Sequence, residues 1–163
     1  MRKVIILGSS RKNGGTRKVI DELRKFSDYD VIDLLDYNIS YYDYEHHNQN
    51  DDFLKIIENI TENYDVFVFA TPVYWYAMSA QMKVFFDRTS DLITIAKDIG
   101  RKLRGKKTAV ITSSIGNHLG DDFFLPFNET FRYFGTEHIA NLHTVADELD
   151  MNALKDFDTA LNQ

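Results

Sequence analysis

The segment Gly8–Thr16 carries the residue types that bind a phosphate group. It reads GSSRKNGGT and follows the apolar run Val4–Leu7. Glycines let backbone N–H groups point inward, and a helix that begins after the segment would add unpaired N–H donors and a positive dipole. Ser9, Arg11 and Thr16 would add side-chain donors. We therefore predict a phosphate site here, the alternative being an ordinary strand–helix turn with Thr16 as the helix N-cap.

The spacing of these glycines matches neither of two common nucleotide motifs. It is not Gly-x-x-x-x-Gly-Lys-Ser/Thr, and it is not Gly-x-Gly-x-x-Gly. Nucleoside triphosphate hydrolysis and a standard dinucleotide-binding fold are therefore disfavoured.

A second segment, Thr71–Tyr76, reads TPVYWY and places three aromatic residues in succession. We interpret it as a loop whose turn is stiffened by Pro72 and whose aromatic side chains cover a flat heterocycle. Backbone N–H groups near Val73 and Tyr74 would meet carbonyl groups of that ring. Packing in the core or at a dimer contact is the alternative for any single aromatic residue here.

A third segment, Ser113–His118, reads SSIGNH and follows another apolar run. It would reach the far edge of the same heterocycle. A plain connection between a strand and a helix explains this segment equally well.

The elements that must position these segments follow from the apolar pattern. Segments with helical spacing separate short β-rich runs, some of them apolar on both faces, as in a parallel sheet covered by helices on both sides. The five expected strands are Val4–Gly8, Asp30–Leu35, Asp65–Pro72, Thr108–Ser114 and Glu137–Val145. Helical spacing joins Val19, Ile20, Leu23 and Phe26; Phe53, Ile56, Ile57 and Ile60; Phe124, Phe127, Phe131 and Phe134; and Leu154, Phe157 and Leu161. The pattern predicts a doubly wound α/β sheet that binds its ligand at the carboxyl ends of the strands.

Length and composition limit the class of protein. The 163 residues fit one domain, and a net charge of −6 argues against binding to nucleic acid. No cysteine is present, which excludes thiolate catalysis and cysteine-held metal clusters and favours a cytoplasmic location. The most apolar stretch, Val66–Met78, is too short to span a membrane.

Together these residues resemble the NAD(P)H-dependent FMN reductase family of the flavodoxin-like superfamily. Gly8–Thr16 is similar to its phosphate loop, and Thr71–Trp75, continuing through Ser79, Lys83 and Phe86–Arg88, is similar to its isoalloxazine loop and following helix. The resemblance also covers Asp51–Phe53, Gly105–Lys107 and Phe134-Gly135, and so spans nearly the whole chain.

The resemblance implies a three-layer fold with a five-stranded parallel sheet of order 2-1-3-4-5, formed by residues 1–163 as one domain. It also implies an FMN cofactor, NAD(P)H as co-substrate and a homodimer with flavin sites near the subunit interface. On this basis the expected FMN-binding residues are Ser9, Ser10, Arg11, Asn13, Gly15, Thr16, Pro72, Val73, Tyr74, Trp75, Ser113, Ser114 and Gly116. No catalytic residue and no metal ligand is assigned.

One departure concerns the iron–sulfur flavoprotein branch, whose overall pattern the chain also resembles. That branch carries clustered cysteines after the second strand, whereas this chain has Asn38–His47 and no cysteine. His46 and His47 with nearby carboxylates suggest a metal site, but adjacent histidines on a polar loop are more often solvated. The helix residues Lys83, Asp87 and Arg88 are candidates for pairing across a dimer, although Lys83 and Asp87 also suit an ordinary helix pair.

The expected function is transfer of electrons from a reduced nicotinamide nucleotide, through FMN, to a small acceptor such as a quinone, a nitro or azo compound, or free flavin. The missing acid–base residues fit this reading because the cofactor carries the chemistry. An electron-carrier flavodoxin acting with protein partners is the main alternative. A receiver domain is disfavoured because Gly8–Ser10 and Thr71-Pro72 replace the acidic residues it requires.

Overall fold

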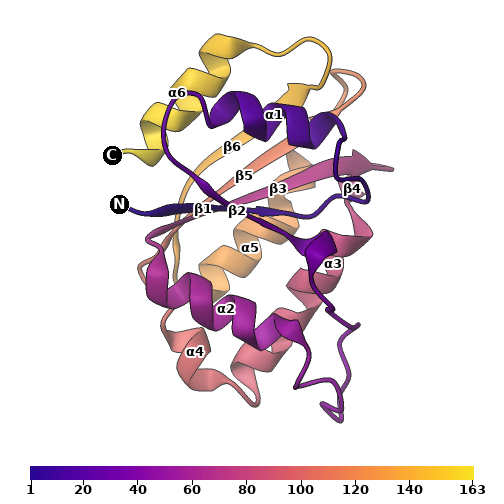
Figure 1. The fold of residues 1–163 in the computed structure, drawn as a ribbon, viewed down its shortest axis with the longest axis vertical. Coiled ribbons are helices and arrows are strands. Elements are labelled where there is room, and N and C mark those ends of the chain that lie inside the picture. The colour runs from indigo at the N-terminus through magenta and orange to yellow at the C-terminus, as the bar shows by residue number, and fades with distance from the viewer.

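The computed structural model describes residues 1–163, in which one parallel sheet lies between two layers of helices (Figure 1). The strands are β1 (Lys3–Leu7), β2 (Asp30–Asp33), β3 (Val66–Tyr74), β4 (Ala77–Met78), β5 (Lys107–Ser114) and β6 (Glu137–Val145). The parallel strands are ordered β2-β1-β3-β5-β6, and the short β4 pairs only with β3, in the antiparallel direction. The predicted five-strand order 2-1-3-4-5 is therefore confirmed.

Helices cover both faces of this sheet. They are α1 (Gly15–Leu23), α2 (Asp52–Asn63), α3 (Ala80–Asp87), α4 (Lys97–Arg101), α5 (Leu125–Phe134) and α6 (Met151–Leu161), with 3₁₀ turns at Leu34–Asp36, Arg88–Ile93 and Asp121–Phe124. Figure 1 shows α1 and α6 on one face and α2, α3, α4 and α5 on the other. No helix is long and apolar enough to cross a membrane.

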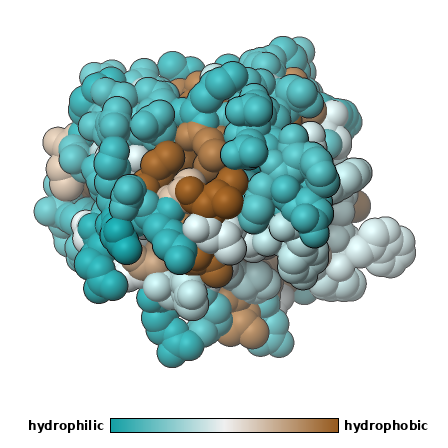
Figure 2. Space-filling model, turned by 90° about the horizontal axis from the view of Figure 1, so that it is seen from below, coloured by the Kyte–Doolittle hydropathy of each residue, from teal (hydrophilic) through white to brown (hydrophobic).

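The central strands form because their alternate side chains enter two separate cores. In β1, Val4 and Ile6 pack into the core under α2 and α5, whereas Ile5 and Leu7 pack into the core under α1 and α6. All four side chains are fully buried, as expected for a strand covered on both faces. The surface seen from below is largely hydrophilic, and its most extensive hydrophobic patch lies near the centre of the view (Figure 2).

Two strand ends differ from the predicted ones by two residues, whereas the other strand boundaries differ by at most one. The second strand ends at Asp33 instead of Leu35, because the Asp33 carboxylate accepts the Leu35 N–H at 3.0 Å and starts a 3₁₀ turn. The third strand continues to Tyr74, beyond the predicted end at Pro72. The strands β1, β3, β5 and β6 all end at one edge of the sheet, away from the two chain termini (Figure 1).

Candidate functional site

A pocket of about 390 Å³ opens at this carboxyl edge of the sheet. It lies beside β1 and β3, where the chain crosses to β2 on one side and to β5 on the other, which is where doubly wound sheets bind ligands. Its wall is formed by Ser9, Arg11, Gly14, Gly15, Thr16, Pro72, Val73, Tyr74, Trp75, Tyr76, Ser113, Ser114, Ile115, His118 and Ala146.

The start of α1 forms one part of this wall. Gly14 is the N-cap residue, has an extended backbone and makes no side-chain capping hydrogen bond, so the first N–H groups of α1 are left without intrahelical partners. The Arg11 guanidinium lies beside them, with its Nε 3.6 Å from the position that a Cβ on Gly14 would occupy. This part of the pocket therefore offers an anion N–H donors, a helix dipole and a cation.

Gly15 is required by the close approach of α1 to the end of β6. A Cβ on Gly15 would lie 2.7 Å from the Cβ of Ala146, a separation that side chains do not tolerate. The absence of a side chain at Gly15 therefore sets how closely the open helix end lies to β6.

The aromatic segment forms a β-hairpin and is not the loop that the sequence suggested. Pro72 lies inside β3 and pairs with Ser113 of β5, so it does not stiffen a turn. The chain turns instead at Trp75 and Tyr76, between the paired residues Tyr74 and Ala77. The prediction was wrong here because β3 continues past its neighbour β1 and folds back on itself through β4.

The turn of this hairpin is strained and exposed. Trp75 and Tyr76 have φ angles of 50° and 63°, the left-handed region that L-residues other than glycine rarely adopt. Trp75 is 94% exposed and Tyr76 is 64% exposed, so core packing does not explain why they occupy this turn. Strain held by exposed aromatic residues at a pocket mouth is typical of a ligand-binding position.

Hydrogen bonds tie the hairpin and the third segment to the first. The Ser10 and Tyr74 hydroxyls lie 2.7 Å apart at the surface. The Thr16 and Ser113 hydroxyls are also 2.7 Å apart and are buried. The three segments that the sequence singled out therefore form one connected wall.

The third segment, which begins at the end of β5, lies beside two histidines, His118 at its own end and His143 of β6. The Ser114 hydroxyl donates to the Gly116 carbonyl at 2.7 Å and also contacts the Nε2 atom of His143 at 2.7 Å. Burial, and then the charge of His118, lower the pKa of His143. His118 itself lines the pocket and packs edge-on against Tyr76, with ring centroids 5.8 Å apart.

Buried hydroxyl groups fix the floor beneath the pocket. The Ser79 hydroxyl donates to the Gly8 carbonyl at 2.6 Å, and the Thr71 hydroxyl accepts the Ser79 N–H at 3.0 Å. Thr112 donates to the Thr71 carbonyl at 2.7 Å, and Thr144 donates to the Thr112 carbonyl at 3.1 Å. This ladder links the ends of four strands, because each buried backbone group finds a partner in the neighbouring element.

The structure brings ten of the thirteen predicted FMN-binding residues to the pocket wall. They are Ser9, Arg11, Gly15, Thr16, Pro72, Val73, Tyr74, Trp75, Ser113 and Ser114. The other three lie outside the wall. Ser10 faces the Tyr74 hydroxyl, Asn13 lies in the exposed turn before α1, and Gly116 receives the hydroxyl of Ser114.

Five wall residues were not among those predicted. Gly14, Tyr76, Ile115 and His118 lie within or next to the segments already recognised, so their positions in the sequence were a usable signal. Ala146 follows β6, the one carboxyl-edge strand whose following loop was not considered. A small residue after the last strand was its only sequence signal.

The segment that replaces the cysteines of the iron–sulfur branch is held by a buried arginine. Arg88 is fully buried and binds Asp51, Asp91 at 2.9 Å and the Ser40 carbonyl at 3.1 Å. It is therefore not available to pair across a dimer. His46 contacts Asp91 at 3.1 Å.

The other two helix residues that were candidates for a dimer contact, Lys83 and Asp87, pair with each other at an exposed i,i+4 spacing. His47 pairs with Asp43 at 2.8 Å, so the two adjacent histidines bind different carboxylates. No group of three or more His, Cys, Asp or Glu side chains is arranged to hold a metal ion.

This sheet, with its pocket at the carboxyl edge, defines a flavodoxin-like protein. The family model described as NADPH-dependent FMN reductase matches residues 1–147. The chain belongs to the NADPH-dependent FMN reductase family, whose cofactor is FMN, and the predicted resemblance is confirmed.

A curated protein of Bacillus subtilis (strain 168), named as the NAD(P)H-dependent FMN-containing oxidoreductase YwqN, is 32% identical over 99 residues. The match covers 57% of this chain and 54% of that protein, so it extends over about half the length of the curated relative.

Two solved structures show the same fold. The Trp repressor binding protein from Bacillus subtilis has a TM-score of 0.76 at 23% identity, covering 98% of this chain and 97% of that one. An FMN-dependent NADH-azoreductase from Bacillus anthracis, solved in complex with FMN, has a TM-score of 0.65 at 15% identity, covering 99% and 98%.

The residues of the pocket fit the chemistry of FMN. Arg11 and the open N-terminus of α1 suit a phosphate. Gly15 adds no side chain at that helix end, because its backbone packs closely on Ala146. Backbone and hydroxyl groups of Ser113 and Ser114 suit the polar atoms of a ring or sugar chain, and the aromatic hairpin suits a flat ring.

Proposed function

We propose that this chain is an FMN-dependent NAD(P)H oxidoreductase that reduces a small acceptor. The observation that carries the proposal is a single pocket that combines an anion-binding helix start with a strained, exposed aromatic hairpin. Bound FMN would supply the redox chemistry, taking electrons from a reduced nicotinamide nucleotide and passing them to the acceptor.

The protein's part is binding and positioning. We propose that Ser9, Ser10, Arg11, Asn13, Gly15 and Thr16 hold the phosphate end of FMN, and that Pro72, Val73, Tyr74, Trp75, Ser113, Ser114 and Gly116 hold its ring and sugar chain. Ten of these residues line the pocket, which supports the assignment. The hydroxyl ladder beneath them keeps the wall fixed, so that the ring end of the pocket is held relative to the phosphate end.

The acceptor that we propose is a quinone, a nitro or azo compound, or free flavin. Trp75 and Ile115 are more than 90% exposed at the pocket wall, and together with Tyr76 they form an open, largely apolar rim. Such a rim favours flat, weakly polar molecules. The solved relative named as an azoreductase is consistent with this class of acceptor.

Three further expectations belong to this proposal. We propose that residues 1–163 act as one FMN-binding unit in the cytoplasm and that two copies associate. The exposed aromatic residues Tyr41, Tyr44 and Trp75, which are 81%, 84% and 94% exposed, support a twofold contact. Light scattering should return a dimer at micromolar concentration, and a monomer throughout that range would reject it.

Comparing FMN with riboflavin tests the phosphate end. The protein should bind FMN much more tightly, and Arg11→Ala should weaken FMN while leaving riboflavin nearly unchanged. Lys12→Ala is the matched control, because this adjacent cation pairs with Asp36 and does not line the pocket. Equal affinity of the parent protein for the two ligands would refute the phosphate assignment.

Anaerobic mixing tests the electron transfer. The FMN-loaded protein should lose its flavin absorbance with NADH or NADPH and regain it when a quinone is added. A protein that stays oxidised with both nucleotides, but is reduced by a partner reductase, would instead be an electron-carrier flavodoxin.

A further inference from the structure

The segment from Ile115 to Leu119, which follows β5, has few contacts that hold it in place. Its backbone groups make a single hydrogen bond, in which the Gly116 carbonyl accepts the Ser114 hydroxyl at 2.7 Å. The Ile115 side chain is 96% exposed, and Leu119 is only partly buried against the core. The position of this segment at the pocket therefore depends on what holds the Ser114 hydroxyl.

Two neighbours contact the Ser114 hydroxyl, and together they determine where its proton lies. The Gly116 carbonyl and the Nε2 atom of His143 are each 2.7 Å from the Ser114 oxygen. A carbonyl only accepts hydrogen bonds, and a serine hydroxyl has one proton to donate. The hydroxyl therefore donates to Gly116, and His143 must carry a proton on Nε2 and donate it to the Ser114 oxygen.

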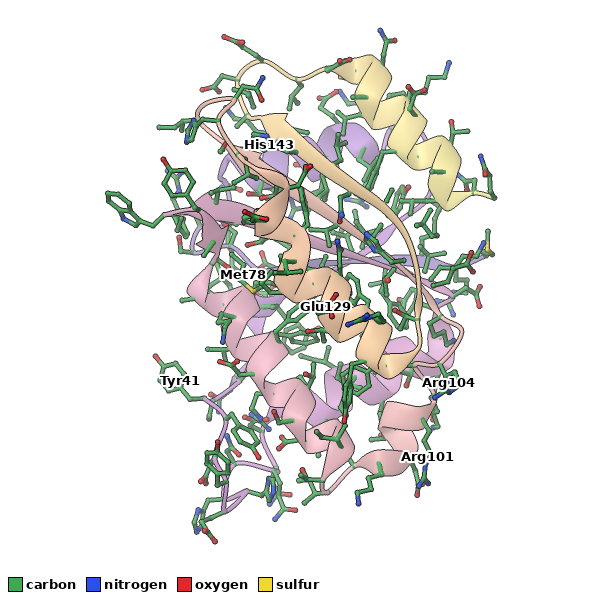
Figure 3. The ribbon with its side chains drawn as sticks, turned by 180° about the vertical axis from the view of Figure 1, so that it is seen from behind. Tyr41, Met78, Arg101, Arg104, Glu129 and His143 are labelled. Atoms are coloured by element: carbon green, nitrogen blue, oxygen red, sulfur yellow. The ribbon has the colours of Figure 1, made fainter.

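His143 thus orients Ser114 from outside the pocket. It lies near the carboxyl end of β6 (Figure 3) and is not one of the wall residues, whereas Ser114 is. A serine side chain has three staggered rotamers, and the Nε2–H group of His143 favours the one that also reaches the Gly116 carbonyl.

The turn that begins at Ser114 also sets the position of His118. A Cβ on Gly116 would lie 2.8 Å from the Nδ1 atom of His118, so the imidazole folds back over a position where a side chain would displace it. The same imidazole packs edge-on against Tyr76 of the hairpin, with ring centroids 5.8 Å apart. A shift of Gly116 would therefore displace His118 and break the contact between this segment and the hairpin.

We propose that His143 is a positioning residue for the ring end of the FMN pocket. Through the Ser114 hydroxyl it holds the turn from Ser114 to His118 against the hairpin that carries Tyr76. The inference rests on the proposed function, because there Ser114 and Gly116 hold the ring and sugar chain of FMN. His143 itself lies outside the wall and acts only through Ser114.

Flavin affinity, measured by fluorescence titration, tests the proposal without turnover. His143→Leu removes the donor and should weaken FMN and riboflavin by the same factor, about three- to tenfold, the effect of one hydrogen bond. Arg11→Ala should instead weaken FMN alone. His143→Gln keeps an amide N–H donor and should restore most of the affinity. His143→Asn has a shorter amide and should behave like His143→Leu, which keeps the test available if the leucine variant does not fold.

A double-mutant cycle tests whether His143 acts through Ser114. Ser114→Ala removes the hydroxyl that His143 orients, so adding His143→Leu to it should cause no further loss of flavin affinity. A role for His143 that only supports the packing of β6 would weaken flavin binding by the same factor in both backgrounds.

Limited proteolysis of the flavin-free protein provides a second readout. Thermolysin, which cleaves before large apolar residues, should cut before Ile115 or Leu119 about three- to tenfold faster in His143→Leu than in the parent protein. His138→Leu is the matched control. It removes a histidine from the same strand, but His138 stacks on Phe131 and lies outside the pocket wall, so flavin affinity and cleavage in this segment should stay unchanged.

The outcomes separate this inference from the proposed function. Unchanged flavin affinity in His143→Leu and His143→Asn, with a parent protein that binds FMN, would overturn the inference and leave the oxidoreductase assignment standing. A loss that persists in the Ser114→Ala background, or an equal loss with His138→Leu, would overturn it as well. A parent protein that binds neither flavin would overturn the proposed function and the inference together.

Discussion

Replacing Trp75 by glycine should stabilise the protein while damaging the proposed site. Trp75 has a φ angle of 50°, and its side chain is 94% exposed, so its removal loses almost no packing. Glycine adopts this left-handed conformation without steric penalty, whereas alanine does not. Trp75→Gly and Trp75→Ala therefore remove the same aromatic ring but differ in backbone strain.

The size of the effect follows from that conformation. A left-handed backbone costs an L-residue roughly 1–2 kcal/mol, and glycine avoids this cost. The greater freedom of glycine in the unfolded chain destabilises the folded state by about 0.5–1 kcal/mol and so offsets part of that stabilisation. Trp75→Gly should thus be more stable than Trp75→Ala by about 1 kcal/mol. For a chain of this length that difference raises Tm by about 2–4 °C.

Urea unfolding of the protein freed of FMN measures this difference without a contribution from ligand binding. Thermal unfolding provides a second measurement. Both variants should alter nucleotide or acceptor kinetics to a similar extent, because both lack the indole ring.

Equal stability of the two variants, or a more stable Trp75→Ala, would show that the turn at Trp75 and Tyr76 is not strained. Unchanged acceptor kinetics in both variants would show that the indole ring has no role at the pocket mouth. The two parts of the reasoning therefore fail separately.

Three other substitutions probe the framework of the site. Gly15→Ala should destabilise by about 1–3 kcal/mol and weaken FMN binding, because the new Cβ would lie 2.7 Å from that of Ala146; thermal unfolding and FMN titration should show rescue by Ala146→Gly. Burial would raise the pKa of Asp51, but hydrogen bonds from Arg88 and from backbone N–H groups lower it below the ordinary value of 3.8. Its contribution to the unfolding free energy should be complete above about pH 4 and be lost as the pH falls through the lower folded-state pKa, and urea unfolding of Asp51→Asn should show a weaker acid dependence. Ser79→Ala should cost about 1–3 kcal/mol in urea unfolding, because it leaves a buried carbonyl at the end of β1 without its donor.

The strands of the sheet could be predicted from the sequence because each strand is marked by an apolar pattern within a few consecutive residues. Val4–Leu7 alternates between two cores that are both apolar, so an unbroken apolar run is the pattern of a strand buried on both faces. The strand order came from the family resemblance. The short strand β4 was missed because two-residue hairpin turns are normally recognised by Asn-Gly or Asp-Gly, and this one is Trp75-Tyr76.

The side-chain neighbours across the sheet were not predictable in the same way. Arg88 resembles a surface residue in the sequence. Asp91 is its i,i+3 neighbour, but only the fold brings Asp51 and the Ser40 carbonyl to it. The position of Ala146 depends likewise on how closely α1 approaches β6. No local spacing encodes the approach of Asp51, Ser40 or Ala146, because these partners lie tens of residues away or more.

The floor and the rim of the pocket differ in what substitution would change. Thr71, Ser79 and Thr112 are fully buried and hydrogen-bonded to the backbone of neighbouring elements. Substitutions there would therefore disturb the fold as well as ligand binding. Trp75 and Ile115 are more than 90% exposed and support no core packing. Substitutions at these two positions can therefore change the shape of the mouth at little cost in stability, so we expect them to change the choice of the proposed acceptor without unfolding the protein.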